Sequence, residues 1–125
     1  MEFNFREKHT LERNKTVATE DISENNLNWI AGFLEGEGYF RRRRNIYSSV
    51  GASQKDLESL VKLQNFFGGS LRLDFNHKNK TGEDLYIYHW EVHGNRAKAI
   101  CRLIYKYMSR KRQIQIDNML FGRGG

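Results

Sequence analysis

The stretch WIAGFLEGEGYF, residues 29–40, joins an apolar segment of helical spacing to two carboxylates, Glu35 and Glu37. Gly32 and Gly36 fall inside the predicted helix, where each glycine costs up to about 1 kcal/mol relative to alanine. The carboxylates fall at its C-terminal end, where the helix macrodipole disfavours negative charge. Two breaches of local preference so close together are typical of a functional site.

The predicted helix begins after Ser23, whose hydroxyl can cap its first turn, and it ends at Gly38. One stripe at helical spacing comprises Leu27, Ile30, Ala31 and Leu34. Another side of the same helix carries Trp29, Gly32, Phe33 and Gly36. A helix that is apolar on more than one side is buried on more than one side. We therefore expect this helix at the centre of the protein.

Patterns of period two follow the helix and predict strands. The first pair of strands is expected over 39–44 and 46–53. A second pair is expected over 71–75 and 85–92, with a polar loop at 77–84 between them. Consecutive strands joined by short connections favour antiparallel pairing.

Capping residues mark three further helices. Asp56 begins the first, which Gly68-Gly69 closes. Gly94 opens the second, whose apolar stripe extends to Met108. The third, which Ser109 caps, holds the apolar residues Ile114 and Leu120. The order helix, two strands, helix, two strands, helix, helix predicts an α+β fold, with helices on one face of an antiparallel four-stranded sheet.

The composition favours a polyanionic partner. The 125 residues carry a formal net charge of +6 and a pI near 9.6, which indicates nucleic acid first and an anionic membrane surface second. We expect a polar arm at 1–22, one domain at 23–121 and a glycine-rich tail at 122–125. No apolar run reaches the length of a membrane span. With Cys101 as the single cysteine and no targeting signal, an intracellular, reducing location is expected.

Residues 30–38, IAGFLEGEG, resemble the signature of the LAGLIDADG homing endonucleases, and specifically of the single-motif, homodimeric type. The resemblance continues in GASQKDLESLVKLQNFFGGSLRL at 51–73 and in YHWEVHGNRAKAICRLIYKYMSRKRQIQI at 88–116. It spans roughly residues 27–120 and implies an αββαββα domain. Such a protein would reside in a bacterial or phage cytoplasm, or inside an organelle that encodes it.

The resemblance implies a role for the glycines and the acids. Two copies of the signature helix would pack closely at their glycines, through an interface of Trp29, Gly32, Phe33, Glu35 and Gly36. Glu37, with the backbone carbonyl of Gly36, would hold Mg²⁺, for which Mn²⁺ can substitute. Because one motif supplies one acid and a double-strand break needs two, the chain should act as a homodimer with twofold symmetry. Glu35 would orient the helix junction rather than bind metal.

The resemblance also assigns catalytic residues outside the motif. Gln54 matches a position that holds solvent near the scissile phosphate, and Arg110 or Lys111 a basic position near the same phosphate. Glu58 stands where relatives can carry a second basic residue. Two plainer interpretations stay open: Gln54 as a helix-entry residue, and the basic cluster at 110–112 as a phosphate anchor.

If Glu37 points to the scissile phosphates, as the resemblance implies, alternation along the strands places one set of side chains on the DNA side. Arginine donates two hydrogen bonds to guanine edges, and a two-stranded ribbon fits the major groove. A strand of about eight residues covers roughly 26 Å, so a dimer would read a pseudo-palindrome of roughly 16–20 base pairs. The arginine run could also be a charged edge strand that prevents aggregation. Lys55, Lys78 and Lys80 are expected on phosphates. The expected base-reading residues are Tyr39, Arg41, Arg43, Tyr47, Ser49, Ser53, Arg72, Asp74, His89 and Glu91.

The leading hypothesis is therefore a site-specific DNA endonuclease that makes a staggered double-strand break by metal-dependent phosphodiester hydrolysis. The alternative is a LAGLIDADG protein that has lost cleavage and acts as an intron RNA maturase or a DNA-binding regulator. Glu58 leaves room for the alternative, whereas Glu37 favours nuclease activity.

Overall fold

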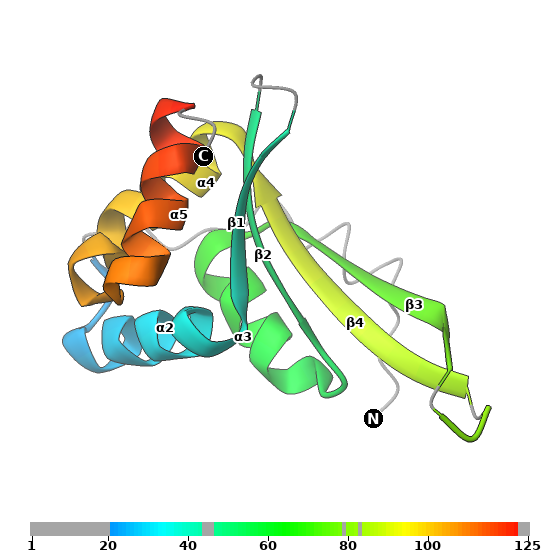
Figure 1. Ribbon diagram of the computed structural model, residues 1–125. Helices are drawn as coiled ribbons and strands as arrows, with labels where there is room; N and C mark the ends of the chain where they lie inside the picture. The colour runs from blue at the N-terminus through cyan, green and yellow to red at the C-terminus, as the bar shows by residue number, and fades with distance from the viewer. Residues whose placement is uncertain (1–20, 44–46, 79, 83, 123–125) are drawn as a thin grey trace.

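Figure 1 presents the computed structural model, which describes residues 21–43, 47–78, 80–82 and 84–122. The domain expected over 23–121 falls almost wholly within these ranges. Most of the predicted arm at 1–22 and the last three residues of the predicted tail lie outside them.

The strands form one antiparallel sheet in the order β1-β2-β4-β3. The strands are β1 (Gly38–Arg43), β2 (Tyr47–Gln54), β3 (Ser70–Lys78) and β4 (Asp84–His93). The last two extend further than predicted, because residues 77 and 78 pair with residues 85 and 84. The prediction rested on alternating apolar residues, but backbone hydrogen bonds extend the β3–β4 hairpin past the last of them. The polar loop expected at 77–84 is therefore shorter than predicted.

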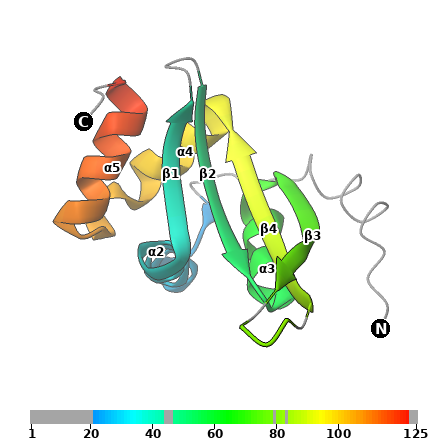
Figure 2. The same ribbon diagram turned by 45° about the vertical axis from the view of Figure 1, so that its right-hand side comes forward.

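Among the described residues, four α-helices lie against one face of the sheet, and none of the described elements covers the other face (Figures 1 and 2). They are α2 (Glu24–Glu37), α3 (Leu57–Phe67), α4 (Gly94–Ile104) and α5 (Arg110–Phe121), with the 3₁₀ turn η2 (Tyr105–Tyr107) after α4. The predicted side-chain caps at Ser23, Asp56 and Ser109 are all present. The α+β prediction, an antiparallel four-stranded sheet with helices on one face, is confirmed.

The core lies between the sheet and the helices, around the fully buried Trp90. The indole N–H of Trp90 donates to the carbonyl of Gly68 at 2.8 Å, which ties the end of α3 to β4. Gly69 has a φ of +97°, and a Cβ there would lie 2.7 Å from the Glu91 carbonyl oxygen. Only glycine satisfies both conditions. Other fully buried side chains are Ile30, Leu34, Val50, Leu60, Leu63, Ile100, Cys101, Ile104, Ile116 and Met119.

The packing of the helices departs from the sequence patterns in three places. Ile114 is 47% exposed, whereas Ile116 and Met119 of the same helix are buried, because α5 turns a different side toward β1. Met108 is buried but follows α4 and η2 in extended backbone, so its stripe is not continuous helix. Finally, α2 is fully buried on one side only, because no other element in the described part of the chain covers its glycine side. Figure 1 shows it at the margin of the molecule.

Candidate nucleic-acid interface

The open face of the sheet displays the side chains that alternation assigned to it. The strand register aligns Tyr39 with Gly51 and Glu91 in one row across β1, β2 and β4. A second row aligns Ser53 with His89 and Arg72 across β2, β4 and β3. The residues between these two rows, Ala52 and Trp90, point into the core. The remaining rows of the open face contain Arg41, Ser49 and His93, and Arg43 and Tyr47.

Tyr39 lies across the middle of this face. Its hydroxyl donates to the Glu91 carboxylate, and Gly51 leaves the space for its ring, since a Cβ there would overlap the phenol. His93 contacts the other oxygen of Glu91 at 2.9 Å. Burial raises the pKa of Tyr39, and the bond to Glu91 raises it further. The carboxylate of Glu91 is therefore held by two side chains before any partner arrives.

A second polar group occupies the neighbouring row. The Ser53 hydroxyl lies 2.6 Å from Nδ1 of His89, and Nε2 of His89 lies 3.8 Å from the Asp74 carboxylate. The three side chains come from three different strands, so their contacts fix the side-chain positions across the sheet. Fixed polar groups on a sheet that is open to solvent suit the recognition of base edges.

The cations of this face are more exposed. Arg41, Arg43 and Arg72 are exposed, and the Arg41 guanidinium lies 4.2 Å from the centre of the Tyr39 ring. Tyr47 is 41% exposed and meets the ring of His93 edge-on, with centroids 5.7 Å apart.

Ser49 differs from the expectation, because it is only 1% exposed. Its row partners are Arg41 and His93, whose long side chains flank the short hydroxymethyl group. In this arrangement it supports its neighbours and is not presented to a partner.

The three predicted phosphate-binding lysines lie around the end of the sheet where β2 finishes and β3 meets β4. Lys55 follows β2 and is exposed, and Lys80 is exposed in the turn between β3 and β4. The backbone of Lys78 belongs to β3 and pairs with Asp84, but its side chain lies outside the described residues.

Glu37 is the last residue of α2 and is exposed, as is Gly36 before it. The last carbonyls of a helix lack partners within the helix. Here the Gly38 N–H donates to the carbonyl of Leu34, and Arg112 Nε donates to that of Glu35. Among the described residues, the Gly36 carbonyl has no such partner. An exposed carboxylate and a helix-end carbonyl, both hard oxygen donors, thus lie at adjacent positions.

Glu35 is engaged by α5 of the same chain. Its carboxylate accepts from the Ser109 N–H at 2.7 Å and from the Ser109 hydroxyl at 2.9 Å. Arg112 Nε lies 3.8 Å from the same carboxylate. The predicted role at a helix junction is thus filled within one chain, between α2 and α5. Arg112 was not predicted from the sequence as a member of this junction. The one related signal in the sequence is the predicted helix cap at Ser109, which places Arg112 in the first turn of α5.

The other predicted catalytic residues surround this junction without meeting Glu37. Arg110 and Lys111 are exposed in the first turn of α5, which Glu35 attaches to the end of α2. Gln54 is half-buried at the end of β2, opposite Tyr88, on the helix-covered side by alternation. In the described parts of the chain, no hydrogen bond joins Gln54 to Glu37, and no three His, Cys, Asp or Glu side chains gather as a metal site.

None of the described residues packs against the side of α2 that carries Gly32 and Gly36. A Cβ added at Gly32 or Gly36 would meet no atom within 4 Å. Trp29 and Phe33 stack beside the glycines with ring centroids 5.3 Å apart, and both are only partly buried. Lys62 of α3 lies 4.0 Å from the centre of the Trp29 ring. The adjoining pocket, of about 380 Å³, is lined by Trp29, Glu58, Ser59, Val61, Lys62 and Asn65.

Comparison with known proteins finds a similarity that covers a short part of the chain. No protein-family model matches the sequence. The chain is 40% identical over 47 residues to the intron-encoded RNA maturase bI4 of Saccharomyces cerevisiae. The similarity covers 36% of this chain and 7% of that protein, so the chain matches only a small part of the yeast maturase. The similarity is consistent with the resemblance to the LAGLIDADG family. In the described part of the chain, no helix has the length and apolar character to cross a membrane.

Proposed function

We propose that this chain is a LAGLIDADG homing endonuclease, which acts as a homodimer and makes a staggered double-strand break in DNA by metal-dependent hydrolysis. The observation that carries the proposal is the end of α2. No described residue lies within 4 Å of a Cβ built at Gly32 or Gly36 on its glycine side. The exposed Glu37 is its last residue, directly before β1 of the sheet.

A second copy of the chain is the occupant that best fits the glycine side. Gly32 and Gly36 would let two α2 backbones approach closely, and the exposed parts of Trp29 and Phe33 would become buried. The contact would be isologous, so both Glu37 carboxylates would lie near the twofold axis. One carboxylate would then serve each DNA strand.

The donors at the end of α2 fit Mg²⁺. Mg²⁺ prefers oxygen ligands, binds few carboxylates and keeps several waters, and one carboxylate with one free carbonyl from each chain matches that preference. Glu37 and Gly36 would hold the ion, and Mn²⁺ could replace it. When bound, the ion supplies an activated water and stabilises the departing 3′-oxygen of the phosphodiester.

The remaining residues position the DNA. Arg110 and Lys111, which the Glu35–Ser109 contact places beside the end of α2, would neutralise the phosphate under attack. Gln54 would orient solvent at the same end of the sheet. The open face would read bases through Tyr39, Arg41, Arg43, Tyr47, Ser53, Arg72, Asp74, His89 and Glu91, with Lys55, Lys78 and Lys80 on phosphates.

The second candidate function is that of an intron RNA maturase without nuclease activity. The name of the yeast relative favours it. So does Glu58, which is exposed on α3 and offers a negative charge where a second cation would aid the reaction. An exposed carboxylate at Glu37 favours the nuclease, because it would repel phosphate unless a cation lies between them.

The experiment is selection from a library of partly randomised pseudo-palindromic duplexes, incubated with the protein and Mg²⁺, followed by sequencing of the cut ends. We expect staggered ends at a defined site. Glu37→Gln should reduce cleavage by about 100-fold or more, with binding to the selected site and thermal stability unchanged. Equal cleavage by Glu37→Gln, or no cut site for the wild type, would overturn the proposal. Binding of intron RNA without any DNA cleavage would favour the maturase.

A further inference from the structure

The positive charge of the chain is concentrated away from the open face of the sheet. The segment from α4 to α5, residues 94–122, contains seven lysines and arginines and a single acid, Asp117. Its net charge of +6 equals that of the whole chain, so the other residues balance to zero. The charge on the open face is smaller, since Arg41, Arg43 and Arg72 are accompanied there by Asp74 and Glu91. The most basic segment therefore lies in the helical layer.

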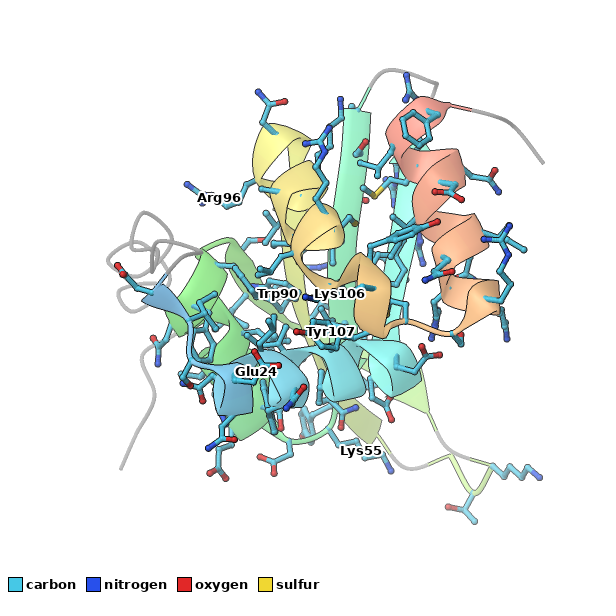
Figure 3. All side chains as sticks on the ribbon, turned by 90° about the vertical axis from the view of Figure 1, so that its left-hand side faces the viewer. Glu24, Lys55, Trp90, Arg96, Lys106 and Tyr107 are labelled. Carbon is cyan, nitrogen blue, oxygen red and sulfur yellow. The ribbon has the colours of Figure 1, made fainter. Side chains whose placement is uncertain are left out.

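Three cations of this segment form a stripe on the outer side of the helices. Lys98, Arg102 and Lys106 follow one another at intervals of four residues along α4 and η2. The opposite side of α4 is buried against the sheet through Ala97, Ile100, Cys101 and Ile104. Figure 3 views the molecule from the helical side and labels Lys106 of this stripe, together with Arg96 near the start of α4. The hydrophobic core thus separates the stripe from the open face.

The spacing of the stripe is unfavourable for an isolated helix. Like charges four residues apart repel each other and destabilise a helix. Among the residues that the structure describes, none of these three side chains forms an ion pair. A bound polyanion would remove the repulsion, because phosphates would lie between successive cations. Lys98 and Arg102 are about 6 Å apart along the axis of α4, the rise of four α-helical residues, and Lys106 continues the stripe in η2. Cations at such intervals can follow one phosphate backbone.

Two tyrosines lie at the end of the stripe. Tyr105 and Tyr107 are half-buried, and the Lys106 ammonium lies 5.2 Å from the centre of the Tyr107 ring. Their hydroxyls donate to Asp117 and Glu24, each at 3.2 Å, which holds each ring by its edge. Aromatic rings beside cations bind unpaired bases by stacking. Unpaired bases occur in the loops and bulges of folded RNA, whereas in duplex DNA they are stacked and paired.

We propose that the outer surface of α4 and η2, formed by Lys98, Arg102, Lys106, Tyr105 and Tyr107, binds single-stranded segments of a folded RNA. This surface is distinct from the open face of the sheet, so RNA and duplex DNA bind on opposite sides of the core. The site goes beyond the proposed nuclease function and does not depend on it. Two acids mark the edges of this surface: Glu24 on the side of α2 and Asp117 on the side of α5.

The test compares two triple variants of the full chain that remove equal charge. The first is Lys98→Gln/Arg102→Gln/Lys106→Gln, and its matched control on the sheet is Arg41→Gln/Arg43→Gln/Arg72→Gln. Fluorescence anisotropy measures binding to a labelled RNA hairpin with an unpaired loop, between about 50 and 200 mM salt. For the helical variant, the slope of log K against log salt should become shallower by about 2, since each single-strand phosphate contact contributes about 0.7. Its binding to duplex DNA should not change.

The control variant should lose duplex binding and keep RNA binding. Equal loss of RNA binding in both variants would overturn the proposal, because it would indicate net charge alone. Displacement of the hairpin by duplex DNA would assign the surface to DNA. If the stripe is required for binding to anionic vesicles but not for binding to RNA, the surface belongs to a membrane partner instead. The thermal midpoint of the helical variant should be unchanged or raised, because its substitutions remove repulsion between like charges. Arg102→Gln alone is a milder variant for use if the triple variant does not fold. Absence of DNA cleavage by the wild type would end the nuclease proposal and leave this result intact.

Discussion

At the scale of single residues, Tyr39 shows how a side chain on an open surface can be fixed before binding. Gly51 leaves room for its ring, and the Glu91 carboxylate accepts a hydrogen bond from its hydroxyl. Burial and this hydrogen bond both favour the neutral phenol, so the pKa of Tyr39 lies above its ordinary value. The ordered ring in turn carries the guanidinium of Arg41 on its face.

Tyr39→Phe should therefore change the pH dependence of stability. A raised pKa in the folded state contributes stability that is fully present below the pKa of the unfolded chain, about 10. That contribution is lost as the pH rises through the folded-state value. Urea unfolding from pH 8 to 11 should show the free-energy difference between wild type and Tyr39→Phe constant at first and shrinking above pH 10. A difference that grows with pH would contradict the assignment.

Gly32 gives opposite predictions for one chain and for two. Within a single chain, Gly32→Ala should stabilise α2 by up to about 1 kcal/mol, because alanine is the better helix former and its methyl meets no atom. In a dimer packed through α2, the same methyl would separate the helices and weaken association. Sedimentation equilibrium with thermal unfolding measures both effects. Stabilisation without any change in association would place the interface elsewhere.

At the scale of elements, the two acids at the end of α2 have different roles. Glu35 holds α5 through Ser109 and Arg112, whereas Glu37 is exposed. The contacts of Glu35 therefore connect the last turn of α2, which carries Glu37, to the first turn of α5, which carries Arg110. These two helices are far apart in the sequence.

Glu35→Ala should destabilise the protein by about 1–2 kcal/mol, because it removes charge-assisted hydrogen bonds that are partly exposed. Glu35→Gln, which keeps the shape and one acceptor oxygen, should lose less. Glu37→Ala is the matched control and should be neutral or slightly stabilising, since it removes an acid from the negative end of a helix. Urea unfolding of the three variants checks the order. Equal losses at both positions would contradict the division of roles.

At the scale of the whole molecule, the described residues of one chain form a layer of helices and a sheet, and they leave one sheet face and the glycine side of α2 uncovered. If a second copy covers that side, the folded state is stabilised by association, and the thermal midpoint rises with protein concentration. Gly32→Leu, which is too large for a close helix contact, should abolish this dependence. Scanning calorimetry over a broad range of concentrations is the measurement. A wild-type midpoint that is independent of concentration would show that the chain folds and remains a monomer.

Local patterns in the sequence determined most of the fold. Ser23, Asp56 and Ser109 cap helices through contacts within three residues of themselves, and such contacts can be read from the sequence. Alternation assigned Tyr39, Glu91 and His89 to one face, because side chains of a strand change sides at every residue.

Only the tertiary structure decided which groups meet across the chain. Glu35 meets Ser109 from 74 positions away, and Ser49 is buried between the side chains of neighbouring strands. Ile116 rather than Ile114 enters the core because α5 is oriented by its contacts with β1 and α2. The pattern of a sequence fixes the period of each element, but the rotation of an element about its axis depends on partners distant in the chain. The glycine side of α2 is the clearest case, because the sequence predicted a contact surface there and none of the described residues covers it.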